Sequence, residues 1–319
     1  AASTPGIILM TEDKDIQTPQ PKSTVEEVYT QILKDINEAL DLGGLPDVAV
    51  NKMRFNKPAA YAVKALTLLN MQKWDEAEEA AQQALAINGD VNNYNTSYLG
   101  TTQGYLISGT YTVINREKKG TDEDYFCNGK SDFCNCYTPT TMANLEDGHA
   151  YKDKMSNFNM MYDYLMDAGE SMLGEPGFNI TYDLNSYWND GGLRSTQMYL
   201  TIAECETHKG NYDTAMEYLD RVRVNRIAPA KYQPLKGTVT TKEDAIAPVK
   251  QVTLNEDIYT TNIFIDKKRW NQLDGWKQDY SRTLAGKTYT IKPDSKMWVF
   301  PFPMSVMNNN DKITQNYNE

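Results

Sequence analysis

Two stretches of the chain repeat each other and decide the fold: ALTLLNMQKWDEA at residues 65–77 and AECETHKGNYDTA at residues 203–215. In each, an alanine lies late in one helical stretch. A short turn, an aromatic–aspartate pair and a second alanine follow it. The aromatic residues are Trp74 and Tyr212. Because alanine carries no side chain beyond Cβ, these positions allow two helices to approach closely. The pattern predicts two hairpins of tightly packed antiparallel helices.

An aromatic residue that opens the second helix and small residues at the helix crossing are typical of tetratricopeptide hairpins. Helical periodicity extends the first hairpin to about residues 57–88 and the second to about 193–226. A further helix is predicted from the capping Ser23-Thr24 to the Gly43-Gly44 pair. Hairpins so far apart do not make a continuous solenoid. We therefore expect one mainly α domain over residues 1–319, with a helical frame, long irregular loops and a few short strands.

Residues 91–192 differ in composition from both hairpins, because they are rich in Asn, Thr, Gly and Tyr. We expect a loop-rich insertion here, with a short strand within residues 106–114 and a helix near 154–173. Loops this long inside a globular chain are usually functional or disordered. Beyond the second hairpin, the proline-containing stretch 231–250 is predicted as loop with a strand, and 259–273 as helix.

The charge balance excludes several classes of function. The chain has 32 basic and 43 acidic residues, a net charge of −11, which disfavours nucleic acid and anionic membrane surfaces. No apolar run approaches the roughly 20 residues that span a bilayer. There are two histidines, no GxSxG nucleophile elbow and no glycine-rich phosphate loop. We predict no catalytic residue, no cofactor and no metal site, although the acidic run 122–124 leaves a bound cation open.

The cysteines leave their chemistry open. Cys127, Cys134 and Cys136 cluster without the paired spacing of a zinc site, and His149 is a weak candidate for a fourth ligand. A disulfide from Cys127 to one of the other two is possible in an oxidising compartment, and free thiols are the alternative. Cys205 lies among helix-periodic residues and is expected in the core.

Aromatic and amide residues of the loop-rich insertion are the candidate ligand-binding groups. Sugar rings present flat C–H faces that pack on Trp and Tyr, and their hydroxyls hydrogen-bond to Asn and Asp. The alternative is that these rings cover the helical frame, as we expect for Trp74, Tyr212 and Trp270. The candidates for glycan binding are Tyr94, Asn95, Tyr98, Tyr187, Trp188, Asn189 and Asp190.

Several separated segments resemble the SusD/RagB family (starch-utilisation-system D-like proteins), the cell-surface glycan-binding lipoproteins of Bacteroidetes. Each segment is short, and their common order along the chain makes the resemblance specific. Gln197, Asn271 and Asn309-Asn310 depart from the usual Glu, Asp and Asn-Pro of the family. The N-terminal part that family members usually carry is also expected to be missing. The segments are STVEEVY at 23–29, RFNKPAA at 54–60, MYLTIAE at 198–204, GN at 210–211, KRW at 268–270, FPFP at 300–303 and QNY at 315–317.

The resemblance implies binding without catalysis. It implies an outward-facing lipoprotein of the cell outer membrane that binds oligo- or polysaccharide and delivers it to a SusC-like TonB-dependent transporter. Membrane contact would be only through a lipid anchor that is absent from this chain. Two alternatives remain: a tetratricopeptide-like adaptor for a protein or peptide, and a glycoside hydrolase. A hydrolase needs a pair of carboxylates, but with 43 acidic residues such pairs are expected by chance. The sequence does not name the glycan.

Overall fold

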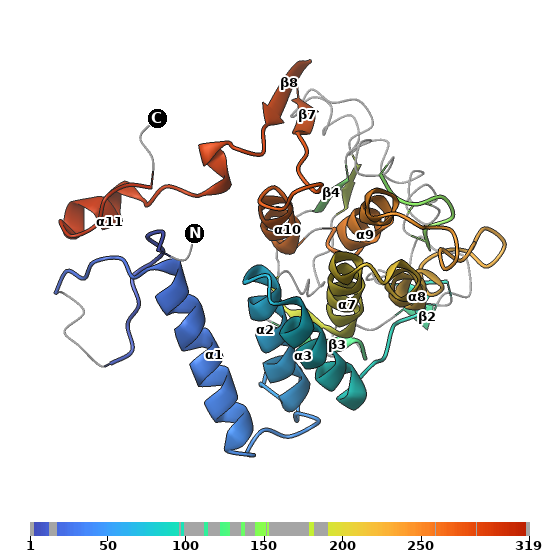
Figure 1. Ribbon diagram of the computed structural model, residues 1–319, viewed down its shortest axis with the longest axis horizontal. Coiled ribbons are helices and arrows are strands. Elements are labelled where there is room, and N and C mark those ends of the chain that lie inside the picture. The colour runs from blue at the N-terminus through green and yellow to red at the C-terminus, as the bar shows by residue number, and fades with distance from the viewer. Residues whose placement is uncertain are drawn as a thin grey trace.

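The computed structural model describes residues 3–12, 18–95, 97–98, 112–113, 122–127, 135–137, 144–150, 152, 179–181, 191–258, 260–284 and 286–316. It confirms the predicted mainly α fold with a few short strands (Figure 1). The helices are α1 (Val25–Asp41), α2 (Lys57–Asn70), α3 (Trp74–Ile87), α7 (Ser195–Lys209), α8 (Tyr212–Arg223), α9 (Lys242–Glu256), α10 (Asn262–Trp270) and α11 (Met304–Asn309), with a 3₁₀ turn η2 (Lys296–Trp298). The strands are β1 (Ser97–Tyr98), β2 (Thr112–Val113), β3 (Asp124–Phe126), β4 (Asn135–Tyr137), β5 (Asn179–Thr181), β6 (Leu193–Arg194), β7 (Tyr280–Leu284) and β8 (Lys287–Ile291).

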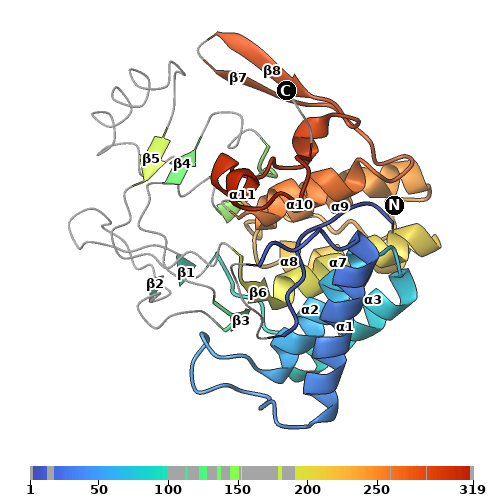
Figure 2. The same cartoon turned by 90° about the vertical axis from the view of Figure 1, so that its left-hand side faces the viewer.

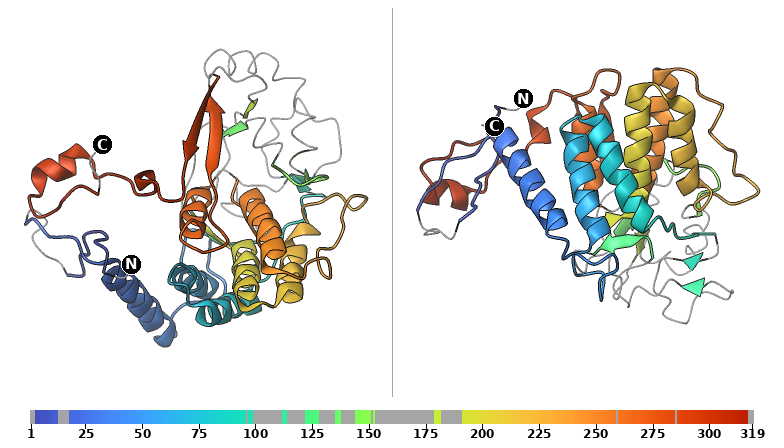
Figure 3. Two further views of the ribbon diagram at one scale, coloured as in Figure 1. Left: turned by 45° about the horizontal axis from the view of Figure 1, so that its top comes forward. Right: turned by 60° about the horizontal axis from the view of Figure 1, so that its bottom comes forward.

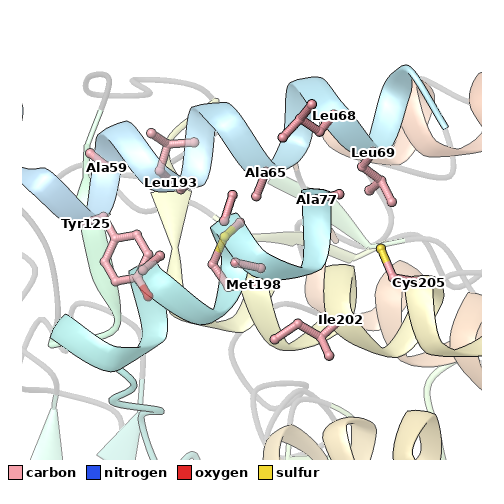
Figure 4. Packing of buried hydrophobic residues seen from close by; sticks show 14 residues of the cluster. Ala59, Ala65, Leu68, Leu69, Ala77, Tyr125, Leu193, Met198, Ile202 and Cys205 are labelled. Carbon is pink, nitrogen blue, oxygen red and sulfur yellow. The ribbon is translucent and has the colours of Figure 1, made fainter. Parts of the chain in front are cut away.

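The two predicted hairpins are α2–α3 and α7–α8, and they lie side by side as one helical layer (Figure 1). The alanines of the repeat, Ala65, Ala77, Ala203 and Ala215, are all fully buried, as close helix crossings require. Helix α3 packs on α7, so segments far apart in sequence share one core. Figure 4 shows this core, in which Cys205 lies buried as predicted.

The turns of both hairpins contain a residue in the left-handed conformation, but the residue type differs. Gly210 ends α7 in the left-handed region at φ 87°, a conformation that favours glycine. In the first hairpin Gln72 takes the left-handed conformation at φ 60°. Gly89, two residues after the end of α3, is a place of close approach, because a Cβ there would lie 2.9 Å from the Tyr199 hydroxyl.

The segments MYLTIAE at 198–204 and KRW at 268–270 meet in the core. Glu204 of α7 accepts hydrogen bonds from the Arg269 guanidinium and, at 3.0 Å, from the Trp270 indole of α10. All three side chains are buried. Burial alone would raise the pKa of Glu204, but the Arg269 charge, the nearby His208 imidazole and the hydrogen bonds from Arg269 and Trp270 hold it at about 2.

Aromatic rings continue this contact across the layer. Trp74 stacks on His208 with a centroid distance of 4.0 Å, His208 lies 5.1 Å from Trp276, and Trp276 lies 5.9 Å from Trp270. Trp270 is fully buried. Trp74 is half-buried between the core shared by α2, α3 and α7 and a second core shared by α7, α8, α9 and α10, which confirms the predicted structural role of both rings. The stack joins the first hairpin to α10.

Helix α1 begins as predicted at Thr24, whose side chain and that of Glu27 form a reciprocal capping box. Its apolar stripe packs on α2, yet none of its side chains is fully buried. The N-terminal arm also contacts the C-terminal tail: the Lys22 ammonium donates to the Thr314 carbonyl at 2.9 Å, and the Asn310 amide donates to the Gln20 carbonyl at 2.9 Å. Figure 3 shows both ends of the chain on the same side of the molecule.

The expectation of loop and strand for residues 231–250 is wrong from residue 242 onward. Helix α9 starts at the Thr241 cap and continues through Pro248. Its apolar face is buried against α7 and α8, and this packing outweighs the cost of a proline inside a helix. In the parts of the chain that the structure describes, no helix is both long enough and apolar enough to cross a lipid bilayer.

Candidate functional site

The loop-rich insertion leaves and rejoins the helical frame at one cluster of buried polar residues, which we call the loop base. Strand β3, from the middle of the insertion, pairs antiparallel with β6 at its end. The start of the insertion is held by the amide of Tyr94, which donates to the Asn225 carbonyl at 2.9 Å. The loop base consists of Asn92, Tyr94, Glu123, Arg194, Arg226 and Glu256.

Arg226 is the centre of the loop base. Its guanidinium donates to Glu256 at 2.6 and 3.0 Å and to Glu123 at 3.1 Å, and also to the Asn92 carbonyl. It lies 3.7 Å above the Tyr94 ring. The three charged side chains are 2–3% exposed, so the pairs are almost unscreened by water. One arginine thus ties two points of the insertion to the end of α9.

A second arginine extends the network. Arg194 donates to the Glu256 carbonyl at 3.1 Å and lies 3.4 Å from the Asp257 carboxylate. Burial, followed by the nearby Asp266 carboxylate, raises the pKa of Asp257 well above its usual range. Glu123, in the acidic run 122–124, is buried as the partner of Arg226. In the described parts of the chain, no three His, Cys, Asp or Glu residues gather as a metal site.

His149 closes the loop base from the segment 144–150. It forms an isolated bridge with Ile227 and is 2% exposed. Burial, with the Arg226 charge as the second cause, lowers its pKa from 6.5 to about 3. The folded protein therefore holds a neutral imidazole at any pH near neutrality.

Acid is expected to weaken the fold through His149. Between pH 6.5 and pH 3 His149 is protonated in the unfolded chain but stays neutral in the folded protein. Its contribution to the free energy of unfolding is therefore fully present above pH 6.5 and decreases as the pH falls below 6.5. The expected loss between pH 6.5 and pH 4.5 is about 2 kcal/mol. Urea unfolding at both pH values, on the wild type and on His149→Gln, measures it. An identical pH dependence in the two proteins would contradict this assignment, and His208→Gln controls for the second histidine.

The structure describes two of the sequence-predicted glycan-binding side chains, Tyr94 and Asn95. Tyr94 is 5% exposed, with one face against Arg226 and its hydroxyl 3.4 Å from Glu123, so its ring offers no open face to a sugar. The Tyr94 prediction is therefore corrected to a role in the loop base. Asn95 is half-buried and donates to the Ile227 carbonyl at 3.0 Å.

The other candidates lie outside what the structure describes. Tyr98 is placed only by its backbone, in β1, which pairs in parallel with β2. Residues 187–190, that is Tyr187, Trp188, Asn189 and Asp190, are not among the described residues, nor is the helix expected near 154–173. Their roles remain predictions. The same holds for the cysteine pairing, because Cys127 is described and buried, whereas Cys134 and the side chain of Cys136 are not described.

One cavity lies between the helices, and neither Tyr94 nor Asn95 lines it. Its volume is about 130 Å³, enough for several water molecules, and it opens between α2, α7, α9 and α10. Its charged groups are Glu204, Asp257, Asp266 and Arg269, and Arg269 already contacts two of the carboxylates. We assign no ligand to it.

Sequence reasoning did not find the arginines of the loop base. Arg226 lies three residues after the end of α8 and follows no pattern in the sequence. An arginine close to the end of an amphipathic helix is usually solvated. Its burial depends on Glu123 and Glu256, which come from distant parts of the chain.

Family models match two parts of the chain. The model described as "SusD family" matches residues 187–318, and the one described as "Starch-binding associating with outer membrane" matches residues 4–69. Together they cover more than half of the chain, including both ends of the helical frame. The chain belongs to the SusD/RagB family. No curated protein matches this sequence.

Solved SusD-like structures share the fold of this SusD-family chain. A SusD superfamily protein of Bacteroides thetaiotaomicron is 16% identical, with a TM-score of 0.65, over 99% of this chain and 72% of its own. A SusD-like protein of Bacteroides fragilis is 15% identical, also with a TM-score of 0.65, over 100% and 76%. A SusD-like carbohydrate binding protein of Bacteroides vulgatus is 18% identical, with a TM-score of 0.56, over 99% and 71%. At these identities the likeness shows the fold alone.

Proposed function

We propose that this chain binds oligo- or polysaccharide at the cell surface and passes it, without breaking a bond, to a SusC-like TonB-dependent transporter of the outer membrane. In this proposal it is an outward-facing lipoprotein. Its membership of the SusD/RagB family carries the proposal. A related structure is described as a carbohydrate binding protein, and one matching family model is described as starch-binding and associated with the outer membrane.

The geometry supports binding by the loop-rich insertion. The helical frame is closely packed, and the aromatic stack and buried ion pairs join its helices. The loop base holds the insertion at its start, middle and end, so aromatic groups carried between these points have fixed anchors. Pre-set anchors lower the entropy that binding must spend. Tyr187 and Trp188, which precede β6 in the sequence, are the groups we propose for stacking against a sugar ring.

Removal of the two rings tests the proposal. We expect Tyr187→Ala and Trp188→Ala each to weaken the affinity for the bound polysaccharide about tenfold, because each removes one stacking surface. Isothermal titration calorimetry against a panel of soluble polysaccharides first identifies the ligand and then measures the variants. Phe300→Ala is the matched control, since this ring is 70% exposed on the C-terminal arm, far along the chain from the insertion.

The outcomes separate the three classes of function. Binding with no release of reducing sugar supports a binding protein, whereas release of sugar from a bound polysaccharide would establish a glycoside hydrolase. The absence of binding across the whole panel would refute the proposal and favour a protein-binding adaptor. Full affinity in both ring variants would refute the assignment of Tyr187 and Trp188.

The transporter partner is a separate part of the proposal. It predicts that the tagged chain captures a TonB-dependent transporter from detergent-solubilised outer membranes of its native cell. Identification of the captured protein by mass spectrometry decides this part independently of the glycan measurements.

A further inference from the structure

The β7–β8 hairpin stands apart from the helical frame and plays no part in the loop base. Among the described residues it pairs with no further strand, and both of its edges are open (Figure 2). Every side chain described from residue 281 to residue 290 is exposed. Isolated two-stranded hairpins are marginal in water. Packing therefore does not explain why the chain maintains this one.

The base of the hairpin is firmly attached. Tyr280 lies edge-on to the buried Trp298 at a centroid distance of 5.8 Å, and the Lys267 ammonium lies 4.7 Å from the Tyr280 ring. Along the strands, hydroxyl pairs join Ser281 to Thr290 at 2.7 Å and Thr283 to Thr288 at 2.9 Å. The hairpin is thus an ordered projection, and the hydroxyl groups on one of its faces form hydrogen bonds with one another.

The opposite face carries a ring between two cations. Arg282 and Tyr289 are direct cross-strand partners, so their side chains leave the same face. Lys287 stands two residues from Tyr289 on β8, on that face too, with its ammonium 5.1 Å from the ring. Tyr289 is 52% exposed, and its aromatic surface is open to solvent.

The hairpin and the residues that flank it are basic, unlike the chain as a whole. Residues 277–296 hold five basic and two acidic residues, in a protein of net charge −11. Within the described residues neither Arg282 nor Lys287 pairs with a carboxylate, and both side chains are exposed. Unpaired cations beside an exposed ring favour a ligand that is both flat and anionic.

We propose that Arg282, Lys287 and Tyr289 bind an anionic saccharide, one bearing carboxylate or sulfate groups. The sugar ring stacks on Tyr289, Arg282 takes the anionic group with two parallel N–H donors, and Lys287 adds a second positive charge. Each contact is weak at an exposed site, and a polymer with a charge on each repeat engages several chains or several units at once. This inference rests on the proposed function and names a ligand class for it.

Paired titrations of the full chain test the inference. The anionic probes are polygalacturonate and chondroitin sulfate, and the neutral probes are amylose and pullulan. We expect Arg282→Gln with Lys287→Gln to weaken binding of an anionic probe about tenfold, and Tyr289→Ser to weaken it further. Raising the salt to about 0.5 M, where the Debye length is about 4 Å, should weaken wild-type binding to a similar extent. The matched control is Thr283→Val with Thr288→Val on the opposite face, which should change nothing.

The results distinguish this inference from the proposed function. Unchanged affinity of the cation variant for the anionic probes would overturn the inference. Wild-type binding to neutral probes alone would also overturn it and leave the proposed function standing. If no polysaccharide binds at all, both fail. A melting temperature of each variant within about 2 °C of the wild type shows that the exposed substitutions have not unfolded the chain.

Discussion

Replacing Arg226 by methionine is expected to lower the free energy of unfolding by about 3–5 kcal/mol. Methionine fills much of the same space but leaves the carboxylates of Glu123 and Glu256 buried with no cation. It also frees the Asn92 carbonyl and removes the charge over the Tyr94 ring. The two carboxylates then lie without the cation that contacts them, in a site that water does not reach. Urea unfolding followed by circular dichroism measures the change.

Two further variants test the origin of the loss at Arg226. Arg221→Met, on the preceding helix α8, is the matched control, since the Arg221–Glu217 pair is exposed and its removal should cost less than about 1 kcal/mol. Adding Glu123→Gln and Glu256→Gln to Arg226→Met should recover a large part of the stability, because no buried charge then lacks a partner. No recovery would show that side-chain packing, and not charge, makes Arg226 important.

The second large effect is expected at Glu204. We expect Glu204→Gln to cost about 3 kcal/mol at pH 7, because the amide replaces a buried carboxylate that neutralises Arg269 and accepts from the Trp270 indole. Arg269 keeps its contact with Asp266 at 2.7 Å, which limits the loss. Urea unfolding at pH 7 measures the effect, with Glu217→Gln on the exposed face of α8 as the control.

The pH dependence provides an independent check on Glu204. Its folded pKa of about 2 lies below the ordinary value of 4.5, so its contribution is complete above pH 4.5 and is lost as the pH falls toward 2. The stability difference between wild type and Glu204→Gln should therefore shrink between pH 4.5 and pH 2. A difference that stays constant over this range would exclude the buried charge as its cause.

The sequence predicted the hairpins because their signal is local. Helical period, a turn and small residues at the crossing all lie within the repeated stretches, and each hairpin forms from neighbours in the chain. Cys205 and the four alanines were assigned to the core for the same reason and are buried there. The sequence analysis missed the hairpin β7–β8. Its signals were the alternation of threonines with larger side chains along Lys287–Ile291 and Gly286 in the turn, which has a positive φ of 72°.

Tertiary contacts overrode local signals at two places. Helix α9 forms in spite of Pro248, because its apolar face is needed to cover α7 and α8. Tyr94 carries the amphipathic ring that favours sugar binding in an exposed loop, yet Arg226 from α8's end takes that ring into the protein. Whether a tyrosine binds ligand or anchors a loop therefore depends on the side chains that pack against it, and these come from distant parts of the sequence.

The amino-acid sequence alone therefore determined the helical hairpins, the class of the fold and the family, since these depend on periodic patterns and short motifs that survive in order along the chain. Only the tertiary structure decided which charges are buried and paired. Glu204 meets Arg269, and Arg226 meets Glu123, across 65 and 103 residues of sequence. Burial in a medium of low polarity gives such pairs their strength. Burial of a charged pair depends on how separate helices and strands pack together, so the residue pattern within any one helix or strand does not reveal it.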